Sequence, residues 1–211
     1  MTTQKRTLIH RLGLLGLVSL LAYTAAVLFA PSAYPGYDWK SRAVSDLMSD
    51  LAPSRKLWTR IATLYGVSGI VSVTVVCVFI AGRFNRLLRS GIYLFAVMNW
   101  VSYVGYGIFP LSDNVNAGGF QDTMHIAVTI AVVALSIASL VLIIIGGLRK
   151  RLYTSLALWA FIALAVMLAG AIGTGLAPVT YFGIFERFSV FAATGFNAVL
   201  GIYLFNGFSG R

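Results

Sequence analysis

The chain has 211 residues, of which 59% are hydrophobic and only 10% are charged, and its mean hydropathy is +0.87. Soluble domains carry roughly 25% charged residues, so this composition excludes an ordinary soluble protein and predicts an integral membrane protein. The formal net charge of +10 would favour nucleic acid as the partner of a soluble chain. In a membrane protein, basic residues report orientation instead, and we expect no nucleic-acid partner.

Six apolar segments are long enough to cross a membrane, because a spanning helix needs about 20 predominantly apolar residues. They cover residues 12–30, 58–81, 91–111, 126–148, 153–177 and 184–205. The connections between them are too short to build a separate soluble core. The sequence therefore predicts one all-α domain, residues 1–211, that forms a bundle of six transmembrane helices. The basic residues Lys5 and Arg6 precede the first segment, as in a signal peptide. The apolar run of this segment exceeds the roughly 7–15 residues of such peptides, so we expect the segment to be retained as a membrane helix.

Charged residues are sorted between the two sides of this bundle. The N-terminus, the second and fourth loops and the C-terminus carry ten basic residues and no acidic one, whereas every acidic residue lies in or beside the first, third and fifth loops. The positive-inside rule assigns the purely basic side to the cytoplasm. We therefore expect a multi-pass protein of the plasma (inner) membrane with cytoplasmic N- and C-termini and with loops one, three and five outside.

Two similar phrases follow apolar segments on the predicted outer side. "APSAYPGYD" begins at Ala30 and "APVTYFGIFE" begins at Ala177. All five prolines of the chain lie on this side, where a proline just past a helix end stops the helix because it has no N–H and its ring blocks the preceding turn. The phrases therefore mark helix ends, and whether they record a duplication or chance similarity stays open.

The first outer loop contains a stretch with helical periodicity between Lys40 and Pro53. Its apolar positions are Val44, Leu47, Met48 and Leu51. This spacing predicts a short amphipathic helix in the first extracytoplasmic loop. Such a helix would lie along the outer interface or cap the bundle, and a structural lid with a solvated acidic face is the alternative.

Two polar residues that could take part in catalysis or binding lie at the start of the fourth segment. Asp122 and His125 are three residues apart and share a helix face. Asp122 is a natural N-cap. A helix N-terminus disfavours added positive charge, so His125 is expected to be neutral and able to accept a proton near neutral pH.

The sixth segment begins with Glu186 and Arg187. Glutamate suits the positive end of a helix, but arginine does not, so Arg187 needs a compensating partner. Adjacent helical residues point about 100° apart, which makes Glu186 a poor partner. We therefore expect Asp46 or Asp113 to pair with Arg187, and we expect Asp46, Asp113, His125, Glu186 and Arg187 to converge.

These residues support three functional hypotheses. In the first, an outer polar pocket binds, and as an extension moves, the headgroup of a membrane lipid or another amphiphilic small molecule. Its proposed ligand-binding residues are Arg187 and Arg42 for the anionic part and Asp46, Asp113, His125 and Glu186 for the remaining polar groups. The second is a metal-independent lipid hydrolase or transferase that uses His125 as general base, oriented by Asp113 or Asp122. The third is a membrane scaffold or assembly subunit, and a homo-oligomer stays open.

Zinc chemistry is not expected, because a tetrahedral catalytic site usually has three protein ligands with nitrogen or sulfur prominent. The predicted outer side offers one histidine, His125, and no cysteine. We therefore expect no metal and no cofactor.

Several short outer motifs together resemble the pattern of the domain of unknown function 998 family. They are Ser45-Asp46-Leu47, Phe109-Pro110 with Asp113, His125, and Gly183 with Glu186-Arg187. The chain is similar to this family in its six-helix plan over essentially its whole length. The resemblance implies an integral membrane protein and supplies no reaction.

Overall fold

The computed structural model describes residues 6–112, 119–151 and 153–208, and within these ranges the regular structure is entirely helical. The helices are α1 (Leu8–Leu12), α2 (Leu15–Phe29), α3 (Arg55–Ile80), α4 (Arg86–Ile108), α5 (Phe120–Leu148), α6 (Thr154–Leu176) and α7 (Phe182–Phe205). Short 3-10 segments lie at Ala30–Ala33, Ser45–Met48, Arg149–Arg151 and Val179–Tyr181. Among these residues six helical spans are long and apolar enough to cross a membrane, and the first, Leu8–Ala33, combines α1, α2 and the 3-10 segment that follows them. The predicted class of fold is thereby confirmed.

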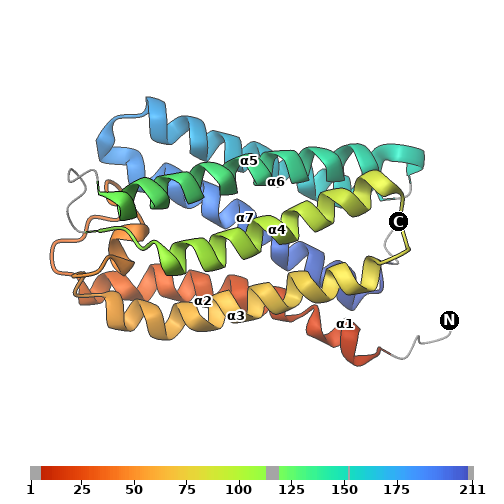
Figure 1. Cartoon of the computed structure of the whole chain (residues 1–211), viewed down its shortest axis with the longest axis horizontal. Helices are drawn as coiled ribbons and strands as arrows, with labels where there is room; N and C mark the ends of the chain where they lie inside the picture. The colour runs from red at the N-terminus through yellow and green to blue at the C-terminus, as the bar shows by residue number, and fades with distance from the viewer. Residues whose placement is uncertain (1–5, 113–118, 152, 209–211) are drawn as a thin grey trace.

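The spans run antiparallel to their neighbours along the chain, and α7 passes between the others (Figure 1). Contacts connect α2, α3, α4, α5, α6 and α7 in order and close the ring between α7 and α2, with a further contact between α3 and α7. All five prolines lie where α2, α4 and α6 end and α3, α5 and α7 begin, at the left of Figure 1. We call this the proline end. Helix α1 and the last turn of α7 lie at the opposite end.

Helix boundaries extend the predicted spans, mostly at their N-terminal sides. Helix α3 starts at Arg55, α4 at Arg86 and α5 at Phe120, three to six residues before the apolar runs. The first span departs from the prediction because it breaks between α1 and α2. There a Cβ on Gly13 would collide with the Gly201 carbonyl oxygen. The two glycines therefore permit α1 and α7 to approach closely.

Two hydrophobic clusters fill the bundle. The larger one occupies the centre and the opposite end, where the rings of Phe95 and Phe196 meet edge to face at 5.1 Å. The smaller one lies at the proline end and combines α2 and α3 with the first loop; its buried members are Tyr23, Ala26, Ala30, Val44, Leu47 and Trp58. Large apolar side chains such as Trp159 and Phe161 of α6 are exposed on the outside of the bundle. That distribution suits a surface that faces lipid.

The predicted amphipathic helix between Lys40 and Pro53 is reduced to the 3-10 turn Ser45–Met48. Val44 and Leu47 of its apolar face are buried, but Leu51 is 83% exposed. The physical reason is that the loop backbone bonds to other segments. The Lys40 carbonyl accepts from Ile184 N at 3.2 Å, and the Leu47 carbonyl accepts from Ser54 Oγ at 2.9 Å. Such bonds replace the i to i−4 bonds of a helix.

Candidate functional site

The N-terminal part of α7 holds the first loop through Arg187, the sixth residue of the helix. Its Nη1 donates to the carbonyls of Trp39 at 2.8 Å, Arg42 at 3.1 Å and Gly183 at 2.7 Å. The side chain is only 7% exposed. Among the described residues no carboxylate lies within ion-pair distance of it. Asp46 therefore forms no ion pair with Arg187, because backbone carbonyls satisfy the guanidinium instead, and Asp113, the other expected partner, lies outside the described residues.

Gly183 makes this close docking feasible. A Cβ built on Gly183 would lie 2.6 Å from the Trp39 carbonyl oxygen and would collide with the Arg42 carbonyl oxygen. Both carbonyls are the acceptors that Arg187 uses. Any side chain at position 183 would therefore push the loop away from its donor.

Tyr37 and Glu186 complete the attachment. The Tyr37 hydroxyl accepts from Arg187 Nη2 at 2.7 Å and donates to the Ala43 carbonyl at 2.7 Å. Burial raises the pKa of Tyr37 to about 12, against the lowering effect of Arg187, so the hydroxyl keeps its proton for donation. Glu186 accepts a hydrogen bond from Val44 N. We call Tyr37, Gly183, Glu186 and Arg187 the loop anchor.

Arg42 and Asp46 lie on the anchored loop and are less buried than Arg187. Arg42 is exposed and donates to the Tyr34 hydroxyl at 2.6 Å, and its guanidinium lies 5.1 Å from the Tyr34 ring centroid. Burial raises the pKa of Asp46 above its ordinary value, and the nearby Arg42 charge lowers it in part. The two charges thus interact, but they do not form an ion pair.

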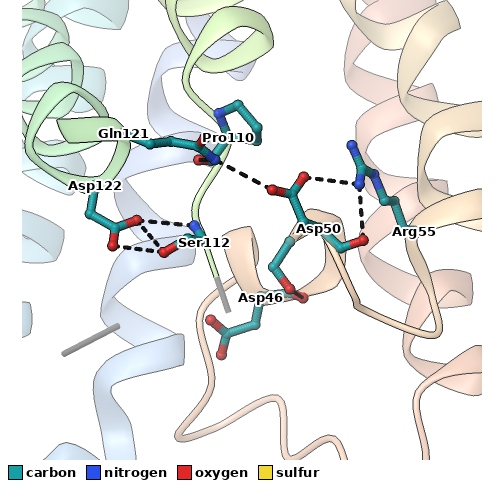
Figure 2. A network of polar contacts seen from close by, with 8 residues as sticks. Asp46, Asp50, Arg55, Pro110, Ser112, Gln121 and Asp122 are labelled. Atoms are coloured by element: carbon teal, nitrogen blue, oxygen red, sulfur yellow. Dashed lines mark hydrogen bonds and ion pairs between the residues drawn. The ribbon is translucent and has the colours of Figure 1, made fainter. Parts of the chain in front are cut away.

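Asp122 and His125 both bond to the chain that leaves α4. Asp122 accepts from Ser112 N at 3.1 Å and from Ser112 Oγ at 2.6 and 2.7 Å (Figure 2). The Nδ1 of His125 lies 2.8 Å from the Phe109 carbonyl. A bond from Nδ1–H to that carbonyl makes Nε2 the acceptor of a neutral ring. Asp122 therefore serves the loop and does not orient His125 through a hydrogen bond.

A second polar network links the first loop to α3 and α5. Figure 2 shows Asp50 paired with Arg55 at 2.9 Å and approached by the Gln121 amide at 3.4 Å. The same amide donates to the Pro110 carbonyl at 2.8 Å. The network therefore connects the first loop and the start of α3 with the start of α5, 71 residues from Asp50 in sequence.

The predicted convergence is found for part of the residue set. Glu186 interacts electrostatically with both Arg187 and Asp46. His125 is connected to this group through Tyr106. The ring centroids of His125 and Tyr106 are 5.0 Å apart, and Tyr106 interacts electrostatically with Glu186. Asp113 lies outside the described residues. Asp122 belongs to the separate contact with Ser112.

Sequence reasoning did not assign roles to Tyr37 or Tyr23. Tyr37 was visible as part of the repeated phrase after Ala30, but nothing local identified its partners. Tyr23 is 2% exposed, and its hydroxyl has no hydrogen-bond partner among the residues that the structure describes. It lies near enough to Glu186 and Arg187 to interact electrostatically with both.

The described residues include no group of three or more His, Cys, Asp or Glu side chains that could hold a metal ion. The polar groups of the proline end instead bond mainly to backbone and hydroxyl groups, as the partners of Arg187 and Asp122 illustrate. The arrangement can fix loops and present charges at the end of the bundle.

The fold and its polar end define the class of this molecule as a six-span helical membrane protein with loops fixed on one end. The chain belongs to the DUF998 family, described as proteins of unknown function, whose model matches residues 17–203. No curated protein and no solved structure matches the chain.

Proposed function

We propose that the chain is a plasma-membrane protein, with both termini in the cytoplasm, that binds the headgroup of a zwitterionic lipid or similar amphiphile at the proline end. Arg42 meets the phosphate, and Asp46 meets the ammonium group. One observation carries the proposal: these opposite charges are held near each other on an anchored loop without forming an ion pair. A ligand with both charges would satisfy the two side chains together.

The loop anchor supports this assignment by fixing the loop backbone. Arg187 donates its hydrogen bonds to the carbonyls of Trp39 and Arg42, so it acts as a positioning residue. Arg42, and not Arg187, contacts the anionic group of the ligand. Trp39 is exposed beside this site. Tryptophan is enriched at membrane–water interfaces, which is the depth of a lipid headgroup.

Native mass spectrometry after gentle extraction from vesicles of phosphatidylethanolamine tests the binding. The wild type is expected to retain the lipid, and Arg42→Gln and Asp46→Asn are each expected to lose it. Lys40→Gln is the matched control because Lys40 is an exposed cation on the same loop, and it should retain the lipid. Absence of retained lipid in the wild type, or equal loss in Lys40→Gln, would contradict the proposal and favour a scaffold role.

Cysteine labelling tests the orientation separately. In a Cys77→Ala background, a cysteine in place of the exposed Thr180 should react with an impermeant thiol reagent in intact cells. A cysteine in place of the exposed Arg86, at the opposite end, should react only after permeabilisation. The reverse pattern would place the proline end in the cytoplasm.

A further inference from the structure

The start of α3 concentrates positive charge where a helix tolerates it least. Arg55, Lys56 and Arg60 are all exposed and fall within its first six residues, and the first turn contains no acidic residue. The N-terminus of a helix carries the positive end of its dipole, so these cations are disfavoured unless anions lie nearby.

The protein itself supplies little of that negative charge. Arg55 pairs with Asp50 at 2.9 Å and also donates to the Asp50 carbonyl at 2.9 Å (Figure 2). Within the described part of the chain, Lys56 and Arg60 have neither an ion pair nor a side-chain hydrogen bond. Two cations therefore stay uncompensated beside one neutralised pair.

These side chains form a groove. Its lining residues are Arg55, Lys56, Thr59, Arg60 and Thr63, and its volume is about 400 Å³, open to the surroundings. Lys56 and Arg60 are four residues apart, as are Thr59 and Thr63, so each pair shares a helix face. The Thr63 hydroxyl already donates to the Thr59 carbonyl at 2.7 Å, so the cations and the Thr59 hydroxyl are the donors that suit the acceptor oxygens of a phosphate group.

The length of α3 is sufficient for the groove to lie at headgroup depth. The helix has 26 residues, which at a rise of about 1.5 Å per residue gives about 39 Å. The hydrocarbon core is about 30 Å thick, so about 9 Å, or six residues, extends beyond it. Those six residues are Arg55 to Arg60 if the other end of α3 meets the opposite boundary of the core.

Apolar surface continues from the groove along the same helix. Leu64 is 55% exposed and Val67 is 47% exposed. Tyr103 of α4 covers Gly66, where a Cβ would collide with the tyrosine ring. A phosphate in the groove with an acyl chain below it would therefore find matching surfaces, which free phosphate would not use.

We propose that this groove is a binding site for the phosphate of an anionic lipid in the leaflet at the proline end, with an acyl chain of the same lipid along Leu64 and Val67. The site is separate from Arg42 and Asp46 and does not depend on the function proposed for them. Its selectivity also differs, because a surplus of cations favours a net negative headgroup.

Native mass spectrometry with vesicles of equal phosphatidylglycerol and phosphatidylcholine tests this site. The wild type is expected to retain phosphatidylglycerol preferentially. The double variant Lys56→Gln/Arg60→Gln should bind it about 25-fold more weakly, since each basic residue near an anionic surface contributes about a factor of five. The double variant Lys56→Arg/Arg60→Lys keeps both charges and should keep the preference. Thermal unfolding checks that all forms are folded.

Equal retention of phosphatidylglycerol by the wild type and the neutral double variant would overturn the site. So would an Arg42→Gln variant, which lacks the zwitterionic site, that shows no preference for phosphatidylglycerol over phosphatidylcholine. Displacement of the lipid by inorganic phosphate at matched ionic strength, with chloride as the control salt, would overturn the assignment to a lipid. Arg42→Gln should leave phosphatidylglycerol retention unchanged, which separates a failure here from a failure of the zwitterionic site.

Discussion

The beginnings of α7 and α3 pose the same electrostatic problem and solve it differently. Each helix starts at the proline end and carries basic charge within its first six residues, near the positive end of its dipole. Arg187 of α7 is buried, and loop carbonyls satisfy it. Lys56 and Arg60 of α3 are exposed and line an open groove. A cation at a helix start is therefore structural when the protein surrounds it and available for binding when the protein leaves it uncovered.

The largest effect on stability should come from removing the buried arginine. Arg187→Met removes the guanidinium donor of the Trp39 and Arg42 carbonyls and leaves the Arg42 carbonyl only the Tyr37 hydroxyl at 3.4 Å, and hydrogen bonds to charged groups contribute about 1.5–3 kcal/mol each. We expect a loss of about 3 kcal/mol, measured by thermal unfolding in detergent. An unchanged unfolding midpoint would show that Arg187 does not hold the loop, and would contradict the structural role that distinguishes the start of α7 from that of α3.

A smaller loss is expected when the loop is pushed from α7. Gly183→Ala places a Cβ against the Trp39 and Arg42 carbonyls, and overpacking of this kind costs about 1–3 kcal/mol. Gly195→Ala in the same helix is the matched control, because a Cβ there meets nothing within 4 Å. Equal midpoints for the two variants would show that the close approach at Gly183 does not matter.

Tyr37→Phe should cost less than Arg187→Met, about 2 kcal/mol for the two hydrogen bonds that it removes. It removes the acceptor of Arg187 Nη2 and the donor to Ala43 but leaves the other bonds of Arg187 in place. A net contribution of about 1 kcal/mol is typical of a single hydrogen bond. Thermal unfolding measures the loss, and a decrease as large as that of Arg187→Met would show that Tyr37 carries the anchor.

The smallest effect concerns pH and separates two aspartates of the first loop. Burial raises the pKa of Asp46 above its ordinary 3.8, whereas bonds from Ser41 and Lys40 N lower the pKa of the exposed Asp38 below the same value. The contribution of Asp46 to stability is thus fully present below pH 3.8 and is lost as pH rises through its folded pKa. The contribution of Asp38 is present above pH 3.8 and is lost as pH falls through its folded pKa.

Unfolding midpoints on both sides of pH 3.8 test the two signs. Relative to the wild type, Asp46→Asn should gain stability as pH rises, and Asp38→Asn should lose it. The same direction of change in both variants would contradict the environments described for the loop.

The sequence predicted the six spans well because apolar length alone determines them, as the match between residues 153–177 and α6 illustrates. It also predicted that Arg187 needs compensation. It could not identify the partners, because the carbonyls of Trp39 and Arg42 come from about 145 residues away. The same long-range bonds removed the amphipathic helix that local periodicity predicted. Asp122 likewise bonds to Ser112 in the preceding loop, and Gly119 occupies the N-cap position.

The most direct measurement is the unfolding midpoint with and without added phosphatidylglycerol, compared between Lys56→Gln/Arg60→Gln and Tyr37→Phe. A lipid that binds only the folded state raises its stability. The account predicts that, without lipid, the α3 double variant unfolds no earlier than the wild type, because it removes cations that the helix dipole disfavours, and that it loses the lipid-induced increase. Tyr37→Phe should unfold earlier but keep the increase. A full increase in the α3 variant together with its loss in Tyr37→Phe would contradict the division between a structural α7 start and a binding α3 start.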